Sequence, residues 1–201
     1  MRDYKNIDRY ITQLYGDIYP QPEDAGHTDL AMQVITNWCS KLTSVHSVLD
    51  VGAGQGFCQP MFEHFGLTYE GVALGEDVVI AQELGRNIKK MDFSFLDYPD
   101  NSVDLIFSRH SLEHSPLPIL SLMEWNRVSS GFLGIVLPAP EWYTYKGLNH
   151  YSVMTMDHIK QLLDRAGWHV IWDEVKELEF EAGKTETLRP HEYWIMSEKK
   201  R

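Results

Sequence analysis

The sequence has few cysteines, no long hydrophobic run and no recognisable leader. Its two cysteines, Cys39 and Cys58, have neither the spacing of a metal site nor the number that a disulfide framework needs. No apolar stretch approaches the length that crosses a bilayer, and the N-terminal residues lack the hydrophobic core of a signal peptide. We therefore expect a cytoplasmic protein that makes no contact with a membrane.

Positive charge is scarce as well. The chain of 201 residues has 18 lysines and arginines against 29 aspartates and glutamates, which gives a formal net charge of −11. Its one basic cluster is residues 199–201 at the C-terminus. Because a nucleic-acid-binding surface needs a basic face, this composition argues against DNA or RNA as a partner. A hydrophobic content of 43% at this length predicts one globular domain with a core of its own.

Glycines cluster in one informative place, residues 48–57. The pattern is that of a buried strand that ends in a glycine loop and continues into a helix, where the backbone can approach a ligand closely. The loop departs from the dinucleotide fingerprint G-x-G-x-x-G, because its third glycine, Gly56, comes one residue early. Asp50 precedes the first glycine, and a carboxylate there would repel a pyrophosphate but accept an ammonium group. The loop therefore favours S-adenosylmethionine over NAD, with an ordinary strand–turn–helix corner as the alternative.

Strand and helix patterns alternate along the rest of the chain. We expect helices at residues 4–15, at 28–42 with Thr28 as the N-cap, after the glycine loop up to 65, and at 76–84, 116–128 and 155–166. We expect the later strands at residues 69–74, 87–91, 103–107, 132–137, 168–178 and 188–196. The predicted fold is α/β: a Rossmann-like, doubly wound, mostly parallel seven-stranded sheet with an antiparallel edge strand. Residues 1–43 are expected to form an N-terminal helical cap on the domain of residues 44–201.

Residues 44–197 resemble the class I S-adenosylmethionine-dependent methyltransferases, most closely the small-molecule group called type 11. Four stretches carry the resemblance: residues 49–56, 91–93, 101–114 with their Leu-Glu-His ending, and 149–152 followed by a helix, a glycine and Trp168. The implied cofactor is S-adenosylmethionine, and the product is S-adenosylhomocysteine.

The resemblance also implies a role for each motif. It implies that the methionine part of the cofactor is held by Asp50 and the loop residues Gly52, Ala53, Gly54 and Gly56. It implies that Asp92 and Phe93 contact the adenine. Ser108 and Arg109 are then expected to emerge beside the methyl group. One position departs from the family, which has an acid after its second strand where this chain has Ala73. Glu76 or Asp77 from the following turn is expected to replace that acid; alternatively, Leu74 contacts the cofactor there through its backbone and side chain.

Methyl transfer from a sulfonium needs a general base only if the acceptor keeps its proton. Histidine suits an alcohol or phenol acceptor, so His110 and His150 are the catalytic candidates, and a structural role is an equal alternative for each. His110 and His114 have the spacing of two metal ligands on a helix, but no third ligand is evident. The sequence therefore predicts no metal.

The acceptor itself is not encoded in a motif. We expect a small molecule held by Tyr19, His27, Trp142, Tyr145 and Tyr151, and we leave a homodimer open. Because of Ala73, a non-catalytic binding or scaffold module of the same fold is one alternative. A protein or peptide methyltransferase is another, although no motif points to it.

Overall fold

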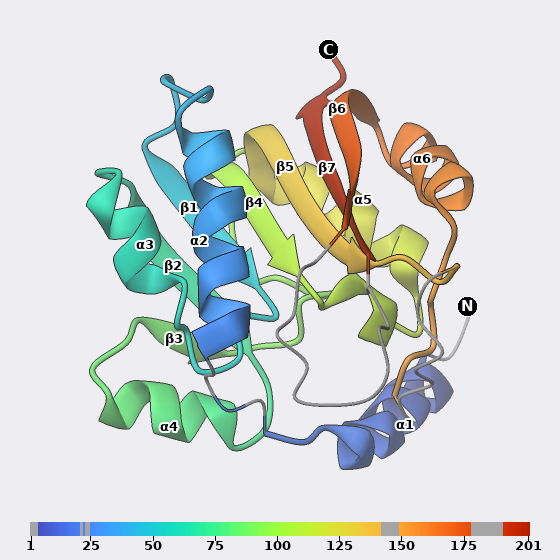
Figure 1. Cartoon of the computed structure of the whole chain (residues 1–201). Helices are drawn as coiled ribbons and strands as arrows, with labels where there is room; N and C mark the ends of the chain where they lie inside the picture. Colours follow the sequence, from blue (N-terminus) through green and yellow to red (C-terminus); the bar gives the residue numbers. More distant parts are fainter. Residues whose placement is uncertain (1–3, 21, 23–24, 142–148, 178–190) are drawn as a thin grey trace, which may run out of the picture.

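A seven-stranded sheet forms the centre of the molecule. The computed structural model describes residues 4–20, 22, 25–141, 149–177 and 191–201 (Figure 1). The strand order is β3-β2-β1-β4-β5-β7-β6. The strands are β1 (Ser47–Val51), β2 (Thr68–Ala73), β3 (Ile88–Lys90), β4 (Val103–Arg109), β5 (Ser129–Pro138), β6 (Trp168–Glu177) and β7 (His191–Lys199). The predicted doubly wound α/β fold is confirmed.

The antiparallel part of the sheet lies at one edge. β7 pairs antiparallel with β5 on one side and with β6 on the other, which confirms the predicted antiparallel pair. β6 is the edge strand, so the antiparallel strand itself lies one position further in. Residues 192–197 of β7 are all buried, as expected of a strand with neighbours on both sides.

Helices cover both faces of the sheet (Figure 1). They are α1 (Lys5–Leu14), α2 (Ala25–Cys39), α3 (Gln59–His64), α4 (Asp77–Glu83), α5 (Pro118–Val128) and α6 (Met156–Arg165). On one face, Trp38 of α2 and Phe62 of α3 both pack edge-on against Phe107 of β4. On the other face, Trp125 of α5 and Trp168 of β6 are completely or almost completely buried in a second core cluster.

The N-terminal helices lie in different places. α1 has no buried residue and lies beside the carboxyl ends of the parallel strands, next to the short helix η1 (Tyr15–Asp17) (Figure 1). α2 instead belongs to the layer on the sheet face, with Val34 and Trp38 in the core. α2 also begins at Ala25, so the predicted start at Thr28 was wrong, and Thr28 lies inside the helix.

The helix boundaries elsewhere follow local chemistry. The Thr155 hydroxyl accepts a hydrogen bond from the backbone N–H of His158 at 3.4 Å, so it caps α6 as predicted. α5 begins at Pro118 rather than at residue 116, because the chain first makes the short helix η2 (Leu112–His114). Within the described part of the chain, no helix combines the length and the hydropathy needed to cross a bilayer.

Candidate functional site

The glycine loop leaves the carboxyl end of β1 and is fixed by its neighbours. The backbone N–H groups of Gly52 and Ala53 both donate to the carbonyl of Val72 on β2, at 2.9 and 3.0 Å. Gly52 has a φ of +77°, and a Cβ there would lie 2.2 Å from the Ser111 hydroxyl. A glycine is therefore required at position 52, both for its backbone conformation and for its close contact with the segment after β4.

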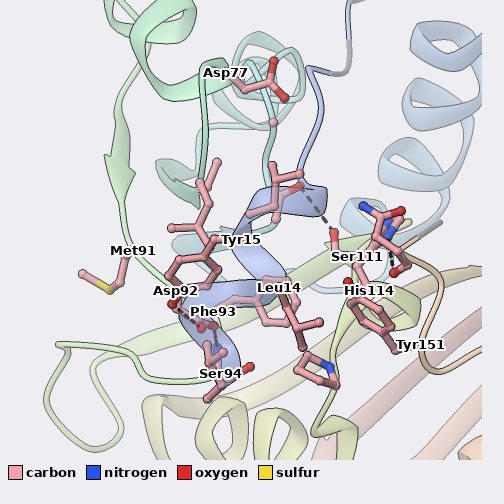
Figure 2. A pocket seen from close by; sticks show the side chains of 18 of the residues that line it. Leu14, Tyr15, Asp77, Met91, Asp92, Phe93, Ser94, Ser111, His114 and Tyr151 are labelled. Atoms are coloured by element: carbon pink, nitrogen blue, oxygen red, sulfur yellow. Dashed lines mark hydrogen bonds between the residues drawn. The ribbon is translucent and has the colours of Figure 1, made fainter. Parts of the chain in front are cut away.

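Two adjoining cavities follow this edge of the sheet. The first has a volume of about 160 Å³ and lies between the glycine loop, η1 and the segment after β3 (Figure 2). The second has a volume of about 460 Å³ and extends toward the ends of β4 and β5. Gly52, Gly54 and Tyr19 line both cavities, as do His110 and His114, so the two spaces meet at the glycine loop.

Asp50 lies in the wall of the second cavity. Its side chain is almost completely buried, and the Tyr69 hydroxyl donates a hydrogen bond of 2.8 Å to its Oδ2. Burial raises the pKa of Asp50 to about 7, although the Tyr69 hydrogen bond and the nearby Arg109 charge oppose this shift. The carboxyl group therefore gains and loses its proton near neutral pH, and a cationic ligand would favour the charged form.

Asp92 lines the first cavity, beside Phe93 (Figure 2). Its Oδ1 accepts a hydrogen bond from the Ser94 backbone N–H at 2.7 Å, and its Oδ2 accepts one from the Tyr15 hydroxyl at 2.9 Å. Tyr15 lies near the Tyr19–Pro22 connector, where the sequence places pocket-lining aromatics, but its contact with Asp92, 77 residues away in the chain, was not predicted.

A second hydrogen bond holds η1 over the same cavity. The Tyr151 hydroxyl donates to Oδ2 of Asp17 at 2.6 Å. Tyr15 and Tyr151 both line the first cavity. The short helix is therefore attached to the cavity on two sides, once through Asp92 and once through Tyr151.

The end of β2 shows which acid is available in place of the one missing at Ala73. Asp77 is 4% exposed, lines the first cavity and accepts a hydrogen bond from Nε2 of Gln55 at 3.0 Å. Glu76 is exposed and does not line either cavity. Leu74 also lines the first cavity. Of the two predicted acids, the structure brings only Asp77 to the site.

The end of β4 carries a buried charge cluster. Nε2 of His110 is 2.6 Å from Oε1 of Glu192 on β7, and Nδ1 of His110 is 3.4 Å from Oε1 of Glu113. Arg109 lies 3.4 Å from the same Glu192 oxygen, and the Trp194 indole N–H donates to the other one at 2.8 Å. Glu192, which sequence analysis missed, therefore links the antiparallel strand to the site. An acid inside the predicted apolar strand was the one available signal.

This cluster sets the protonation of His110. Burial lowers its pKa, but the charge of Glu192 and the hydrogen bonds to Glu113 and Glu192 outweigh burial and raise the pKa to about 9. His110 is therefore protonated at neutral pH. His150, in the second cavity, has a lowered pKa because of burial and the nearby His114, so it is neutral there.

The other predicted site residues are divided between the cavities and the core. Tyr19 lines both cavities and His27 the second. Ser108 is completely buried and lines neither, and a Cβ on Gly56 would meet Ile88 at 2.8 Å, so this glycine serves packing. The predicted substrate residues Trp142 and Tyr145 lie outside the described residues.

Residues 49–132 match the family model described as "Methyltransferase domain". This match confirms the predicted resemblance to the class I S-adenosylmethionine-dependent methyltransferases, and with it S-adenosylmethionine as the cofactor that this family implies. No curated protein sequence matches the chain significantly.

Solved structures share the fold at low sequence identity. One is an S-adenosylmethionine-dependent methyltransferase from Aquifex aeolicus, 21% identical, with a TM-score of 0.65 over 98% of this chain and 99% of that one. Another is a chain of the Haloferax volcanii complex between the Trm112 methyltransferase activator and a methyltransferase, 15% identical, with a TM-score of 0.71 over 88% and 93%. A third is the [4+2]-cyclase SpnF, 16% identical, with a TM-score of 0.69 over 98% and 93%.

Proposed function

We propose that this chain, which carries the domain of the class I methyltransferases, binds S-adenosylmethionine and transfers its methyl group to a small-molecule acceptor. One observation carries the proposal. Two buried or partly buried carboxylates line the adjoining cavities, Asp92 the first and Asp50 the second, and the glycine loop lines both. An ammonium group beside Asp50 and an adenine amino group beside Asp92 suit this arrangement.

The surrounding residues provide the remaining contacts in this proposal. Asp50 accepts the ammonium group, and the backbone of Gly52 and Gly54 lies along the methionine part. Asp77 accepts the ribose hydroxyls in place of the acid missing at Ala73. Asp92 accepts the adenine amino group once Tyr15 releases its Oδ2. Bound S-adenosylmethionine supplies an activated methyl group, so the protein's main contribution is position.

His150 is the proposed general base for an alcohol or phenol acceptor. A base must be neutral before it accepts a proton, and the lowered pKa of His150 meets this condition. His110 does not meet it at neutral pH, because it is already protonated between Glu113 and Glu192. We therefore propose that His110 positions Glu113 and the end of β4, and does not itself remove a proton.

A small acceptor fits the site better than a protein surface or a nucleic acid. η1 covers the first cavity through the Tyr15 and Tyr151 hydrogen bonds, so the site is partly closed. The net charge of −11 argues against a polyanionic acceptor.

We propose the cytoplasm as the location, in agreement with the low cysteine content.

Calorimetric titration with S-adenosylmethionine and with S-adenosylhomocysteine tests the cofactor. We expect both to bind, and a methyl-transfer screen over small hydroxyl and amine acceptors then tests the reaction. Binding without turnover on any acceptor class would favour a non-catalytic module. Methyl transfer must be the readout, because the fold also occurs in SpnF, a [4+2]-cyclase.

Substitution of the two neighbouring acids after β2 tests the ribose contact. We expect Asp77→Asn to weaken S-adenosylmethionine binding about tenfold or more, because a hydrogen bond to a charged group is worth about 1.5–3 kcal/mol. Glu76→Gln is the matched control, since Glu76 is exposed and does not line a cavity. Equal effects of the two substitutions on the dissociation constant would contradict the assignment of Asp77.

Substitution of Tyr15 tests whether its hydroxyl competes with the adenine. We expect Tyr15→Phe to tighten S-adenosylmethionine binding by about two- to tenfold. In the unaltered protein the hydrogen bond from Tyr15 to Oδ2 of Asp92 must break before the adenine binds, at a net cost of about 0.5–1.5 kcal/mol, and phenylalanine forms no such bond. Tyr10→Phe, in the exposed helix α1, controls for the loss of a hydroxyl. Weaker binding in Tyr15→Phe would show instead that Tyr15 is part of the cofactor site.

A further inference from the structure

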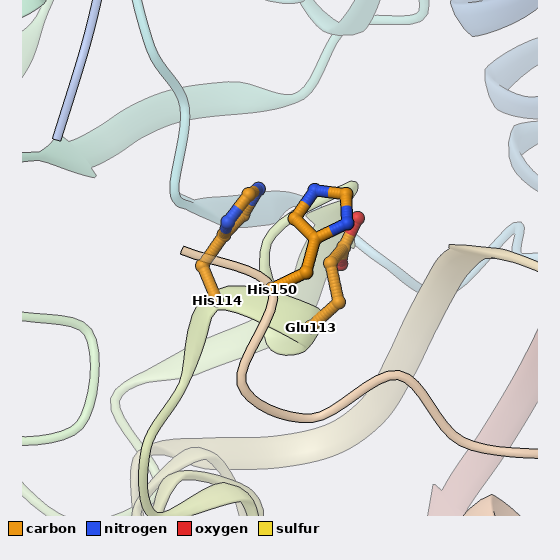
Figure 3. Close-up of side chains that lie close together, drawn as sticks. All are labelled: Glu113, His114 and His150. Carbon is orange, nitrogen blue, oxygen red and sulfur yellow. The ribbon is translucent and has the colours of Figure 1, made fainter. Parts of the chain in front are cut away.

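Three potential metal ligands meet in the wall of the second cavity. Glu113 and His114 belong to η2, and His150 lies in the segment before α6 (Figure 3). One ligand atom from each of the three side chains lies within 4.8 Å of those of the other two. From the sequence, His114 was considered as a metal ligand together with His110, and no third ligand was evident. In the structure its neighbours are Glu113 and His150.

His114 is already held in the tautomer that a metal ligand needs. Its Nδ1 lies 3.2 Å from the carbonyl oxygen of Asn149, which can only accept, so Nδ1 carries the proton. The lone pair is then on Nε2. Metal-binding histidines commonly donate their second ring N–H to a carbonyl or carboxylate in this way, which fixes the orientation of the ring.

Glu113 provides an independent indication of a ligand. Its side chain is 2% exposed, and its Oε1 lies 3.4 Å from Nδ1 of His110. Its Oε2 is buried and has no hydrogen-bond partner within the described ranges of the chain. A buried carboxylate oxygen without a partner is costly, and a bound cation would remove this cost.

We propose that Glu113, His114 and His150 bind one divalent transition-metal ion, of the Zn²⁺ or Fe²⁺ type. Two imidazoles and one carboxylate are a common ligand set for such ions, and three protein ligands leave at least one coordination position open. The cluster lines the second cavity, so the open position is available to a molecule bound there.

The consequence for the acceptor depends on the proposed methyltransferase function. An acceptor hydroxyl bound to the open position loses its proton more readily, because a divalent ion lowers the pKa of a coordinated oxygen. The acceptor oxygen then forms a bond to the methyl carbon as the carbon–sulfur bond breaks. The sulfonium becomes a neutral thioether, and the hydroxyl proton leaves to solvent. In the metal-loaded protein the ion takes over the activation that we assigned to His150.

Cobalt titration of the full chain, free of any affinity tag and treated with a chelator, tests the site. We expect one Co²⁺ per chain, with visible absorption bands of four- or five-coordinate cobalt that disappear when Zn²⁺ is added. Both His150→Gln and Glu113→Gln should weaken Co²⁺ binding by at least about tenfold. His158→Gln, which alters an exposed histidine of α6, should bind as the unaltered protein does.

Equal Co²⁺ binding by all four proteins, or less than one ion per chain in the unaltered protein, would overturn the proposal. Circular dichroism checks that each variant folds. If Glu113→Gln does not fold, the half-buried His150 decides the question, because His150→Gln removes little core packing. The titration contains no S-adenosylmethionine, so its failure would leave the methyltransferase proposal standing, and absent methyl transfer would leave the metal site standing.

Discussion

Asp50→Asn is expected to abolish measurable S-adenosylmethionine binding and, at the same time, to stabilise the fold at pH 8. Asparagine has nearly the same shape as aspartate and still accepts the hydrogen bond from Tyr69. It lacks the negative charge that the ammonium group of the cofactor requires in our proposal. Loss of a charge-assisted contact in a buried site costs several kcal/mol, which corresponds to a loss of affinity of about 100-fold or more.

The stability gain follows from the pKa of Asp50. Its pKa is raised from 3.8 to about 7 by burial, so between these pH values the folded chain holds a proton that the unfolded chain has lost. The unaltered protein therefore loses stability as pH rises from about 4 to 7, and the whole loss is present above pH 7. Asparagine carries no charge to bury. We expect a gain of about 1–3 kcal/mol at pH 8, after allowance for its own amide group.

Urea denaturation at pH 5 and pH 8, together with calorimetric titration, measures both effects. Asp104→Asn is the matched control, because Asp104 accepts the backbone N–H groups of His46 and Ser47 at 2.9 and 3.0 Å, at the start of β4. This control should lose stability and keep cofactor binding. Unchanged affinity in Asp50→Asn would show that the ammonium group binds elsewhere.

Glu192→Gln is expected to lower the free energy of unfolding by about 3–5 kcal/mol. The side chain is 1% exposed and pairs with both His110 and Arg109. Glutamine removes the negative charge and leaves two cationic groups without this partner in a buried place. The pKa of His110 should then fall from about 9, because burial lowers it and only the hydrogen bond to Glu113 still opposes burial.

The pH dependence of stability gives this prediction its sign. The raised pKa of His110 adds stability that is fully present below pH 6.5 and is lost as pH rises through about 9. The pKa of Glu192 is raised by burial but lowered further by His110 and Arg109, to about 2, so its contribution is fully present above pH 4.5 and is lost as pH falls through about 2. The pair therefore stabilises the fold most between pH 4.5 and pH 6.5, and Glu192→Gln should remove the decline between pH 6.5 and 9.

Urea denaturation at pH 6 and pH 9 tests this pH dependence, and proton NMR of the histidine rings tests the pKa of His110. Glu198→Gln controls for the same chemical change on the same strand, because Glu198 is exposed. It should change stability by less than about 0.5 kcal/mol. If His110 still titrated near pH 9 in Glu192→Gln, another group would have to hold its proton.

The parts of the site that could be predicted from the sequence are residues whose position is set by the carboxyl end of one strand. Asp50 lies at the carboxyl end of β1, and Gly52 and Asp92 follow β1 and β3. The carboxyl ends of parallel strands meet at one edge, so the placement of these residues followed from the alternation of strands and helices. The choice between Glu76 and Asp77 depended on where α4 begins and which way its first residues face, which periodicity does not resolve to one residue.

The missed parts are contacts between segments far apart in the chain. Tyr15 and Asp92 are 77 residues apart, and His110 and Glu192 are 82 apart. Neither contact follows from local pattern, because each depends on how the N-terminal segment or β7 is placed against the sheet. The same holds for His114 and His150, which no spacing rule for metal ligands connects.

The position of β7 has a consequence for the order in which the molecule is assembled. The ribosome delivers β5 and β6 before β7, yet among the described strands β6 pairs with β7 alone, and β5 meets β6 only through it. β6 therefore has no strand partner in the described sheet until β7 has been synthesised and lies between β5 and β6. Glu192 arrives with that same strand, so until then Arg109 and His110 lack this counter-charge. The pairing of β5, β7 and β6 and the charge cluster at the end of β4 are thus completed together, once β7 is in place.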